Sequence, residues 1–349
     1  MDQAVEVMKP ILKPYGVEPY FIETFGKVKK VYSNKGTLAV KQLPAKHGVD
    51  FIRNVQFLYQ RGYHHIVPIY PTLDGRYAVW NDGNLFYIMP WLMNEDKENR
   101  FEKHQKLFRE LARLHTLSSK EVTINKEERT EHYEQLTSRW EKEQQFLEEY
   151  IEECEKTTYM SPFQLHYCMY YGDISQALVF SQRKLNEWYE ETKDNDKVRT
   201  VITHGKLSTE HFLFDERGTA YFHNFEQSKV ASPYHDLLPF LSRTLKSYPK
   251  LYDECIDWLV TYFHHFSFRN EEKLLFMSYL AYPSSIIRMV EKYYHDKGSK
   301  RNEIRSVKKL QRYYWMLKNT EYVVMRLNEI EEQRKEEQNK QSEEEKEQA

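Results

Sequence analysis

The residues of this 349-residue chain that could do chemistry gather in one polar segment, which begins at His204 and ends at Glu226. Lys206 carries an ammonium group, which has hydrogen-bond donors only and cannot accept a proton at neutral pH. His211 and Asn224 offer a softer nitrogen and a neutral oxygen, whereas magnesium favours hard, anionic oxygen ligands. The set is therefore poorly suited to proton abstraction and to magnesium binding, although Lys206 could hold an anionic group such as phosphate.

The segment resembles the catalytic and metal-binding loops of the aminoglycoside phosphotransferase and choline kinase group. That group has the pattern H-G-D-L-H-x-x-N-x-L, then a turn, then I-D-F/W. This chain reads H-G-K-L-S-T-E-H-F-L from His204 and H-N-F from His223. By this resemblance, Lys206 stands where the group has its catalytic Asp. His211, five residues later, and Asn224, eighteen residues later, stand at the metal-binding Asn and Asp.

These three replacements predict a kinase-like protein that has lost efficient phosphoryl transfer. A positioned base typically contributes about 10²–10⁴-fold to a rate, and phosphoryl transfer also depends on magnesium to neutralise charge. Glu226 and Glu210 could in principle rescue a metal site. We interpret Glu226 as a polar residue common after this motif, and Glu210 as solvated. Because Lys206 would partly replace the charge of a divalent ion, we expect any ATP binding to occur without Mg²⁺.

Upstream, the alternation of apolar and polar residues over 37–43 predicts a strand that carries Lys41. The resemblance implies that Lys41 binds nucleotide phosphates, like the lysine of the V-A-I-K strand in protein kinases; the alternative is a surface lysine. An amphipathic helix is predicted over 49–61. It contains no Glu that could pair with Lys41, and we interpret its one acid, Asp50, as an N-cap.

Other elements of the amino-terminal region are predicted by turn residues. Gly26 and Gly36 flank a lysine-rich stretch without a G-x-G-x-x-G motif, which favours a solvated hairpin over a phosphate-binding loop. Residues 72–79 predict a hairpin around an Asp-Gly turn, and residues 84–92 predict a further strand and the hinge.

Three residues are predicted to shape the polar segment rather than to react. The segment 108–115 is a predicted helix with the L-A-x-L-H pattern, and the resemblance implies that His115 packs beneath the loop. His204 begins the loop. The sequence P-Y-H-D-L matches the group's P-x-x-D-L motif, which implies that Asp236 is buried and accepts hydrogen bonds from the loop backbone. Since these residues are present without the reactive acids, we expect the loop's shape to be needed although its reaction is not.

Together these elements predict an α/β (α+β) protein with a bilobal, protein kinase-like fold. We expect an N-lobe at 1–92 with a small antiparallel sheet and one helix, and a larger, mainly helical C-lobe at 93–327. Residues 328–349 form a charged, Glu-rich tail, interpreted as a solvated helix extension or a disordered segment.

The amino-acid composition indicates which classes of binding partner and compartment to expect. The net charge is −2, which gives no global footprint for nucleic acid or an anionic membrane surface. No apolar run approaches the roughly 20 residues that a membrane helix requires, and the start shows no signal peptide. The three cysteines lack C-x-x-C spacing and are interpreted as reduced thiols of a cytosolic protein.

Within the kinase-like group, the chain most resembles bacterial spore coat-associated proteins of the YutH and CotS type, up to about Leu327. The stretches L-A-V-K, R-G-Y and L-A-R-L-H, together with the Glu-rich tail, carry this resemblance. It implies synthesis in the mother-cell cytoplasm, deposition in the spore coat and other spore coat proteins as partners.

The predicted function is therefore a catalytically impaired kinase-like component of the spore coat. Two alternatives stay open at this stage. One is an active small-molecule phosphotransferase with an atypical site, and the other is a nucleotidyl transferase on a kinase frame.

Overall fold

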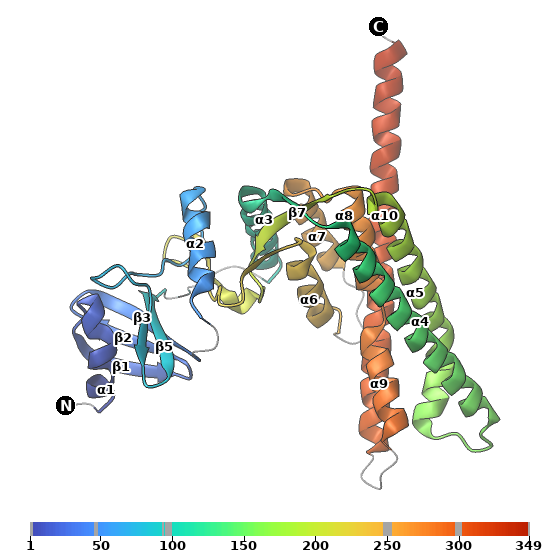
Figure 1. Cartoon of the computed structure of the whole chain (residues 1–349), viewed down its shortest axis with the longest axis horizontal. Coiled ribbons are helices and arrows are strands. Elements are labelled where there is room, and N and C mark those ends of the chain that lie inside the picture. Colours follow the sequence, from blue (N-terminus) through green and yellow to red (C-terminus); the bar gives the residue numbers. More distant parts are fainter. Residues whose placement is uncertain are drawn as a thin grey trace. The chain divides into compact units, whose positions relative to one another are not determined.

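The computed structural model describes residues 3–44, 48–92, 94, 100–246, 253–296 and 302–347. It is a mixed α/β structure with an antiparallel sheet in the amino-terminal part and a larger helical carboxy-terminal part, which confirms the predicted fold class (Figure 1). Contacts divide the chain into two compact units. Unit 1 comprises Met1–Lys120 and Arg199–Asp236, and unit 2 comprises Glu121–Val198 and Leu237–Ala349. The polar segment thus groups with the sheet, while the lobe boundaries at 92 and 327 stay a prediction.

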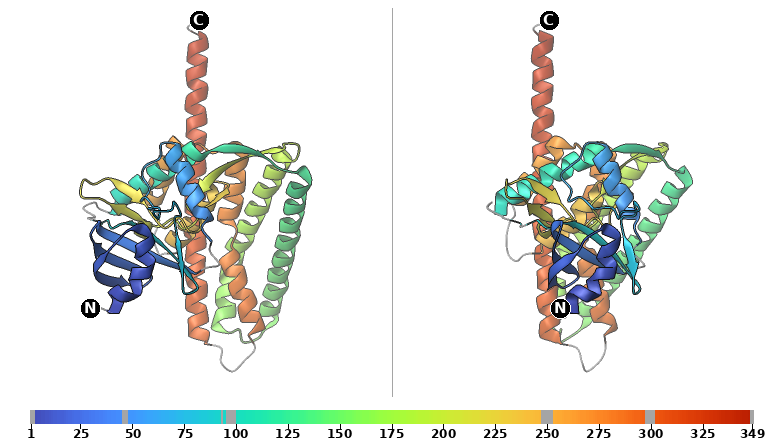
Figure 2. Two further views of the ribbon diagram at one scale, coloured as in Figure 1. Left: turned by 60° about the vertical axis from the view of Figure 1, so that its left-hand side comes forward. Right: turned by 90° about the vertical axis from the view of Figure 1, so that its left-hand side faces the viewer.

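Unit 1 is built on a five-stranded antiparallel sheet with the order β1-β2-β3-β5-β4. Its strands are β1 (Pro19–Phe25), β2 (Val28–Ser33), β3 (Gly36–Pro44), β4 (Val79–Asn81) and β5 (Asn84–Pro90). The chain enters through helix α1 (Gln3–Leu12) and the 3₁₀ turn η1 (Lys13–Tyr15), and α1 lies against the sheet (Figure 2).

The sheet has one core face and one polar face. Leu38 and Val40 of β3 point into the core that α1 shares with the sheet. Because successive side chains of a strand alternate, Ala39 and Lys41 lie on the opposite face. In this way the alternation in the sequence keeps Lys41 away from the α1 core.

Of two hairpins predicted in this region, one forms and the other does not. The lysine-rich stretch between Gly26 and Gly36 forms β2, which is hairpin-paired with both β1 and β3, as predicted. The predicted hairpin over 72–79 is wrong. Thr72 and Arg76 close a local turn instead, with the Thr72 amide donating to the Arg76 carbonyl at 2.6 Å. The Thr72 hydroxyl also donates to the Arg76 carbonyl at 2.8 Å, and side-chain bonds of this kind compete with a strand ladder.

The hairpin of this region joins β4 to β5. Its turn residues, Asp82 and Gly83, have φ values of 46° and 73°. A two-residue type I′ turn requires positive φ at both central positions, which Asp-Gly tolerates well. The predicted strand over 84–92 is confirmed as β5.

Helix α2 (Asp50–Gln60) confirms the predicted helix, but the predicted N-cap is wrong. Val49 occupies the N-cap position and makes no side-chain cap bond, while Asp50 lies in the first turn. An acid there still interacts favourably with the helix dipole.

Helices and short strands surround the polar segment. Helix α3 (Arg100–Ser118) contains His115. Strand β7 (Lys197–Thr203) ends immediately before His204, and its last residues pair with β10 (Lys229–Ala231). The remaining elements of the segment are η3 (Thr209–His211), β8 (Phe212–Phe214) and β9 (Ala220–Phe222). Helix α6 (Tyr234–Thr244) follows and contains Asp236.

Unit 2 is helical. Its helices are α4 (Lys126–Lys156), α5 (Pro162–Thr192), α7 (Asp253–His265), α8 (Asn270–Ala281), α9 (Ser284–His295) and α10 (Glu303–Glu347). The short strand β6 (Lys120–Thr123) precedes α4. The helix α10 continues to Glu347, so residues 328–347 of the Glu-rich tail form a helix extension (Figure 1).

Aromatic stacking holds these helices together. Trp140 stacks on Tyr282 with ring centroids 4.0 Å apart, and Tyr170 stacks on Tyr314 at 3.7 Å. This packing accounts for part of the abundance of tyrosine, 27 residues in all. Within the described residues, no helix combines the length and the apolar character needed to span a membrane.

Candidate functional site

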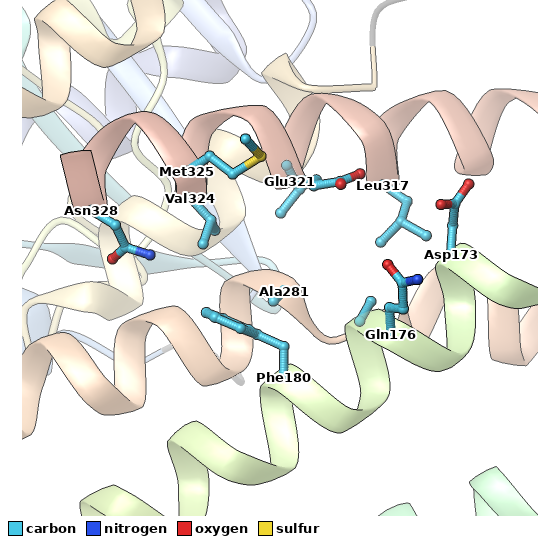
Figure 3. Close-up of a pocket in the computed structure, with 11 residues that line it drawn as sticks. Asp173, Gln176, Phe180, Ala281, Leu317, Glu321, Val324, Met325 and Asn328 are labelled. Carbon is cyan, nitrogen blue, oxygen red and sulfur yellow. The ribbon is translucent and has the colours of Figure 1, made fainter.

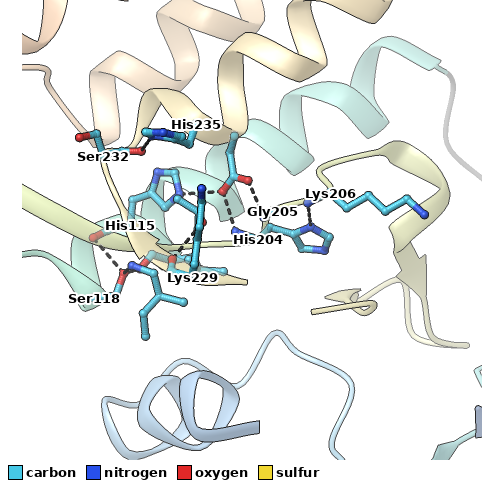
Figure 4. A network of polar contacts seen from close by, with 12 residues as sticks. His115, Ser118, His204, Gly205, Lys206, Lys229, Ser232 and His235 are labelled. Carbon is cyan, nitrogen blue, oxygen red and sulfur yellow. Dashed lines mark hydrogen bonds and ion pairs between the residues drawn. The ribbon is translucent and has the colours of Figure 1, made fainter. Parts of the chain in front are cut away.

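A buried carboxylate organises the start of the polar segment. Asp236 accepts hydrogen bonds from the backbone amides of His204 and Gly205, at 2.7 and 2.8 Å, and lies 3.2 Å from Nε2 of His115 (Figure 4). Burial alone would raise the pKa of Asp236. The hydrogen bond and charge of His115, together with His204 and the loop amides, outweigh this effect and hold the pKa below its ordinary value. Asp236 therefore stays ionised and fixes the backbone around it.

His204 is itself part of this buried frame. Its Nε2 donates to the carbonyl of His223 at 2.8 Å, and its Nδ1 accepts from the amide of Lys206 at 3.2 Å. Full burial lowers the pKa of His204 to about 4, so the ring is neutral near pH 7. Both ring nitrogens are used to shape the loop, and neither is free for proton transfer.

Gly205 meets a steric requirement of the same turn. Its φ is +78°, and a Cβ atom at this position would lie 2.1 Å from the carbonyl oxygen of Gln227. Only glycine combines a positive φ with so close a backbone approach. His115, His204, Gly205 and Asp236 are called the buried frame below.

The three replaced residues lie just beyond the buried frame, and two of them bind each other. Nδ1 of His211 donates to the carbonyl of Lys206 at 2.8 Å, which leaves Nε2 as an acceptor. The Nδ2 group of Asn224 donates to that Nε2 at 2.7 Å. Burial lowers the pKa of His211, in agreement with a neutral ring.

The chain of contacts continues to Lys41. Asn224 has φ of 71°, a left-handed conformation that Asn tolerates, and its Oδ1 accepts from Nζ of Lys41 at 2.5 Å. Lys41 also forms an ion pair with Oε1 of Glu226; the two side chains are only 13% and 7% exposed. The hydroxyl of Tyr87 donates to the same oxygen at 2.5 Å.

Strand register explains why these groups meet. Lys41 on β3 lies directly opposite Tyr87 on β5, so both side chains lie on the same face of the sheet. The connected series from the Lys206 carbonyl through His211, Asn224 and Lys41 to Glu226 and Tyr87 is called the polar chain below.

Burial and opposite charge shift the pKa values of Lys41 and Glu226 within the polar chain. Burial lowers the pKa of Lys41, and the carboxylate of Glu226 opposes that shift. Burial would raise the pKa of Glu226, but Lys41 and the Tyr87 hydroxyl outweigh it and keep the pKa below its ordinary value. Glu226 is therefore ionised, and its carboxylate forms an ion pair with the ammonium group of Lys41.

Helix α2 does not supply the acidic partner of Lys41. Instead, its residue Asn54 donates to the carbonyl and hydroxyl oxygens of Ser228, at 3.2 and 3.0 Å. The pairing of Glu226 with Lys41 was not predicted from the sequence. A signal was present: the predicted helix lacks Glu, while Glu226 follows two residues after Asn224.

The residues at the expected metal positions do not fit a magnesium ion. Asn224 uses its oxygen on Lys41 and its amide nitrogen on His211. The carboxylate of Glu226, two residues after Asn224, forms an ion pair with Lys41. In the part of the chain that the structure describes, no group of three or more His, Cys, Asp or Glu side chains is placed to hold a metal.

Lys206 differs from its neighbours because its side chain is exposed. Figure 4 shows it extending away from the buried frame while its amide bonds to His204. Within the part of the chain that the structure describes, its ammonium group makes no hydrogen bond or ion pair. Lys206 therefore presents a solvated cation, while its backbone carbonyl accepts a hydrogen bond from His211.

Unit 2 contains a separate pocket of about 250 Å³ between α5, α8 and α10 (Figure 3). Phe180 and Met325 line it, with Asp173 and Glu321 at its polar part. Lys318 pairs with both of these acids, so it balances one of their two negative charges.

The structure resembles solved phosphotransferases. An aminoglycoside phosphotransferase from Alicyclobacillus acidocaldarius superposes with a TM-score of 0.69 at 12% identity, covering 93% of this chain and 96% of its own. The chain has an aminoglycoside phosphotransferase fold. Spectinomycin phosphotransferase APH(9)-Ia in complex with ADP and spectinomycin gives a TM-score of 0.52 at 13% identity, covering 92% of this chain and 98% of its own. At these identities the likeness establishes the fold alone.

Sequence comparison adds no closer relative. No protein-family model matches the chain, and the search of curated proteins found no match. The structure places eight of the residues singled out from the sequence in two groups, while Glu210 is exposed. His115, His204 and Asp236 lie in the buried frame, and Lys206, His211, Asn224, Lys41 and Glu226 lie along the polar chain. Their roles stay predictions.

Proposed function

We propose that this protein is a catalytically impaired kinase-like protein, a phosphotransferase fold that no longer transfers phosphate. The polar chain is the observation that carries the proposal. Lys206 stands in place of the base. At the two metal positions, His211 and Asn224 bond to each other, and Asn224 also bonds to Lys41. A transferable phosphate would therefore find neither a proton acceptor nor an anionic metal ligand.

The test is a transfer assay with γ-labelled ATP and Mg²⁺ on the wild-type protein, including ATP hydrolysis as a readout that needs no acceptor. We expect no turnover above the protein-free control. Label released or transferred by the wild type, and lost in Lys41→Met, would overturn the proposal. The same assay with α-labelled ATP distinguishes a nucleotidyl transferase.

We further propose that the protein acts as a component or scaffold of the bacterial spore coat, bound to other spore coat proteins. The support is the resemblance to proteins of the YutH and CotS type, together with the retained buried frame, which preserves the fold without its reaction. A fluorescent fusion expressed in a sporulating bacterium tests this role. Recruitment to the forming spore is expected, and a uniform signal in the mother cell throughout sporulation would contradict it.

A further inference from the structure

A further cavity of unit 2 lies between α7, α8 and α10 and has a volume of about 260 Å³. Its apolar lining comes from these three helices and from the segment between α7 and α8: Val260, Phe263, Phe268, Phe276, Met277, Leu327 and Ile330. Phe268 and Phe276 are buried, whereas Phe263 and Ile330 are only partly buried. The cavity therefore offers apolar surface that the fold itself does not fully cover.

Three phenylalanines form a fixed wall of this cavity. The ring centroid of Phe268 lies 5.0 Å from that of Phe263 and 5.7 Å from that of Phe276, with interplanar angles of 65° and 80°. Edge-to-face packing of this kind is a favoured arrangement of aromatic rings. Because the rings already hold one another in place, an apolar ligand would immobilise few side chains on binding, which favours affinity.

The charged residues at the same cavity are mainly cationic. Lys273 on α8 and both Arg334 and Lys335 on α10 line it, together with the acid Glu331. The Glu331 carboxylate lies 2.7 Å from Nζ of Lys273 and 3.4 Å from Nζ of Lys335. Among the described residues that line the cavity, three positive charges therefore meet one negative charge, which favours an anionic ligand.

Arg334 is the cation that is left for such a ligand. Its side chain is exposed, and it makes no hydrogen bond or ion pair with any residue that the structure describes. Arg334 follows Leu327 by seven positions and Ile330 by four, so the three residues share one face of α10. A guanidinium group has a planar set of donors that matches a carboxylate. A carboxylate at Arg334 would thus be attached to a body that lies beside Ile330.

The volume of the cavity limits the size of the ligand. Drug-sized ligands occupy pockets of roughly 300–1,000 Å³, whereas an apolar cavity of about 150 Å³ binds benzene. We propose that this cavity binds a small amphipathic carboxylate, a single ring or a medium-length alkyl chain with one carboxylate group. The apolar body lies against the phenylalanine wall, and the carboxylate binds Arg334. All the residues involved belong to unit 2, so the inference goes beyond the proposed function and does not depend on it.

Calorimetric titration of the full-length protein with octanoate, below the concentration at which it forms micelles, tests the inference. Wild type is expected to bind octanoate. Octanol, which has the chain without the charge, should bind about tenfold or more weakly, because it lacks charge-assisted hydrogen bonds. Octylamine, whose charge is repelled by the cations of the cavity, should show no measurable binding.

Variants of α10 separate the two parts of the site. Arg334→Gln should weaken octanoate binding by about tenfold or more and leave octanol binding unchanged. Arg305→Gln, a matched substitution of an exposed arginine on the same helix, should bind octanoate like wild type. Ile330→Trp, which fills part of the apolar interior, should weaken the binding of both ligands, and circular dichroism checks that it is folded.

Several results would overturn the inference. They are the absence of octanoate binding by the wild type, equal affinity for octanoate and octanol, and unchanged octanoate affinity in Arg334→Gln. Unchanged octanoate affinity in Ile330→Trp would place the ligand outside the cavity and would overturn the inference as well.

Discussion

The buried frame and the polar chain meet at the segment that begins at His204, yet the buried frame fixes the backbone and the polar chain joins side chains. In the buried frame, Asp236 accepts bonds from two backbone amides and contacts His115. In the polar chain, His211 and Asn224 satisfy each other. The frame has the residues that the phosphotransferase pattern predicts, whereas the polar chain has replacements at each reactive position. On the proposed function, loop geometry and loop chemistry are separable, because the backbone frame is present while the residues at the reactive positions differ.

The largest effect should come from breaking the buried frame. Asp236→Ala leaves the amides of His204 and Gly205 and the ring of His115 without their buried acceptor. Each unsatisfied buried group costs about 1–3 kcal/mol, so we expect the free energy of unfolding to fall by about 4 kcal/mol. Urea unfolding followed by circular dichroism measures it. The control is Lys206→Ala, which removes an exposed side chain of the same loop. Equal losses of unfolding free energy in the two variants would contradict the stabilising role of Asp236.

Acidification should weaken the buried frame next. An unfolded His binds a proton near pH 6.5, whereas folded His204 resists until about pH 4. The unfolded state thus binds more protons between these values, so the contribution of His204 is complete above pH 6.5 and is lost as pH falls towards 4. The shift corresponds to about 3 kcal/mol for this residue.

Unfolding at pH 7 and pH 5 checks this prediction. His204→Gln, which can still donate towards the His223 carbonyl, should lose less stability on acidification than wild type. His264→Gln, at an exposed position of α7, should behave like wild type. An unchanged pH dependence in His204→Gln would show that the neutral ring is not the cause.

Breaking the polar chain at Lys41 should cost less. Lys41→Met removes the cationic partner of the Glu226 carboxylate, whose side chain is 7% exposed, and leaves the Tyr87 hydroxyl bonded to it. We expect the pKa of Glu226 to rise above its wild-type value and stability to fall by about 2 kcal/mol. Carbon-13 NMR of the carboxyl group follows the pKa. The double variant Lys41→Met/Glu226→Gln should recover most of the loss; no recovery would mean that Lys41 acts through packing.

The smallest effect should follow from Lys206→Ala. Its side chain is exposed, and surface substitutions of this kind usually change stability by less than about 0.5 kcal/mol. Thermal unfolding without ligand measures it. A loss of several degrees in melting temperature would show that Lys206 belongs to the structural part of the loop.

Much of the fold could be predicted from short-range patterns. The alternation around Lys41 predicted β3, the apolar periodicity over 49–61 predicted α2, and the resemblance of P-Y-H-D-L implied the acceptor role that the geometry gives to Asp236. The turn at Asp74 was mistaken for a hairpin, because side-chain hydrogen bonds of Thr72 to Asp74 and Arg76 replaced the strand ladder.

The polar chain was beyond prediction for a different reason. The partnership of Lys41 with Glu226 joins residues 185 positions apart, and it depends on the sheet register that places Tyr87 opposite Lys41. Residue types alone indicated that the metal ligands were weak. They did not indicate that Asn224 would bond on one side to His211 and on the other to Lys41.

The central claim is that the loop keeps its shape but not its metal site, and Mn²⁺ binding in the presence of ADP tests it most directly. Electron paramagnetic resonance would compare wild type with the restored variant Lys206→Asp/His211→Asn/Asn224→Asp. The wild-type protein is predicted to leave the Mn²⁺–ADP spectrum unchanged, while the restored variant is predicted to bind the ion, because the buried frame still presents the positions correctly. Binding of Mn²⁺ by the wild type, abolished by Asn224→Ala, would contradict the account.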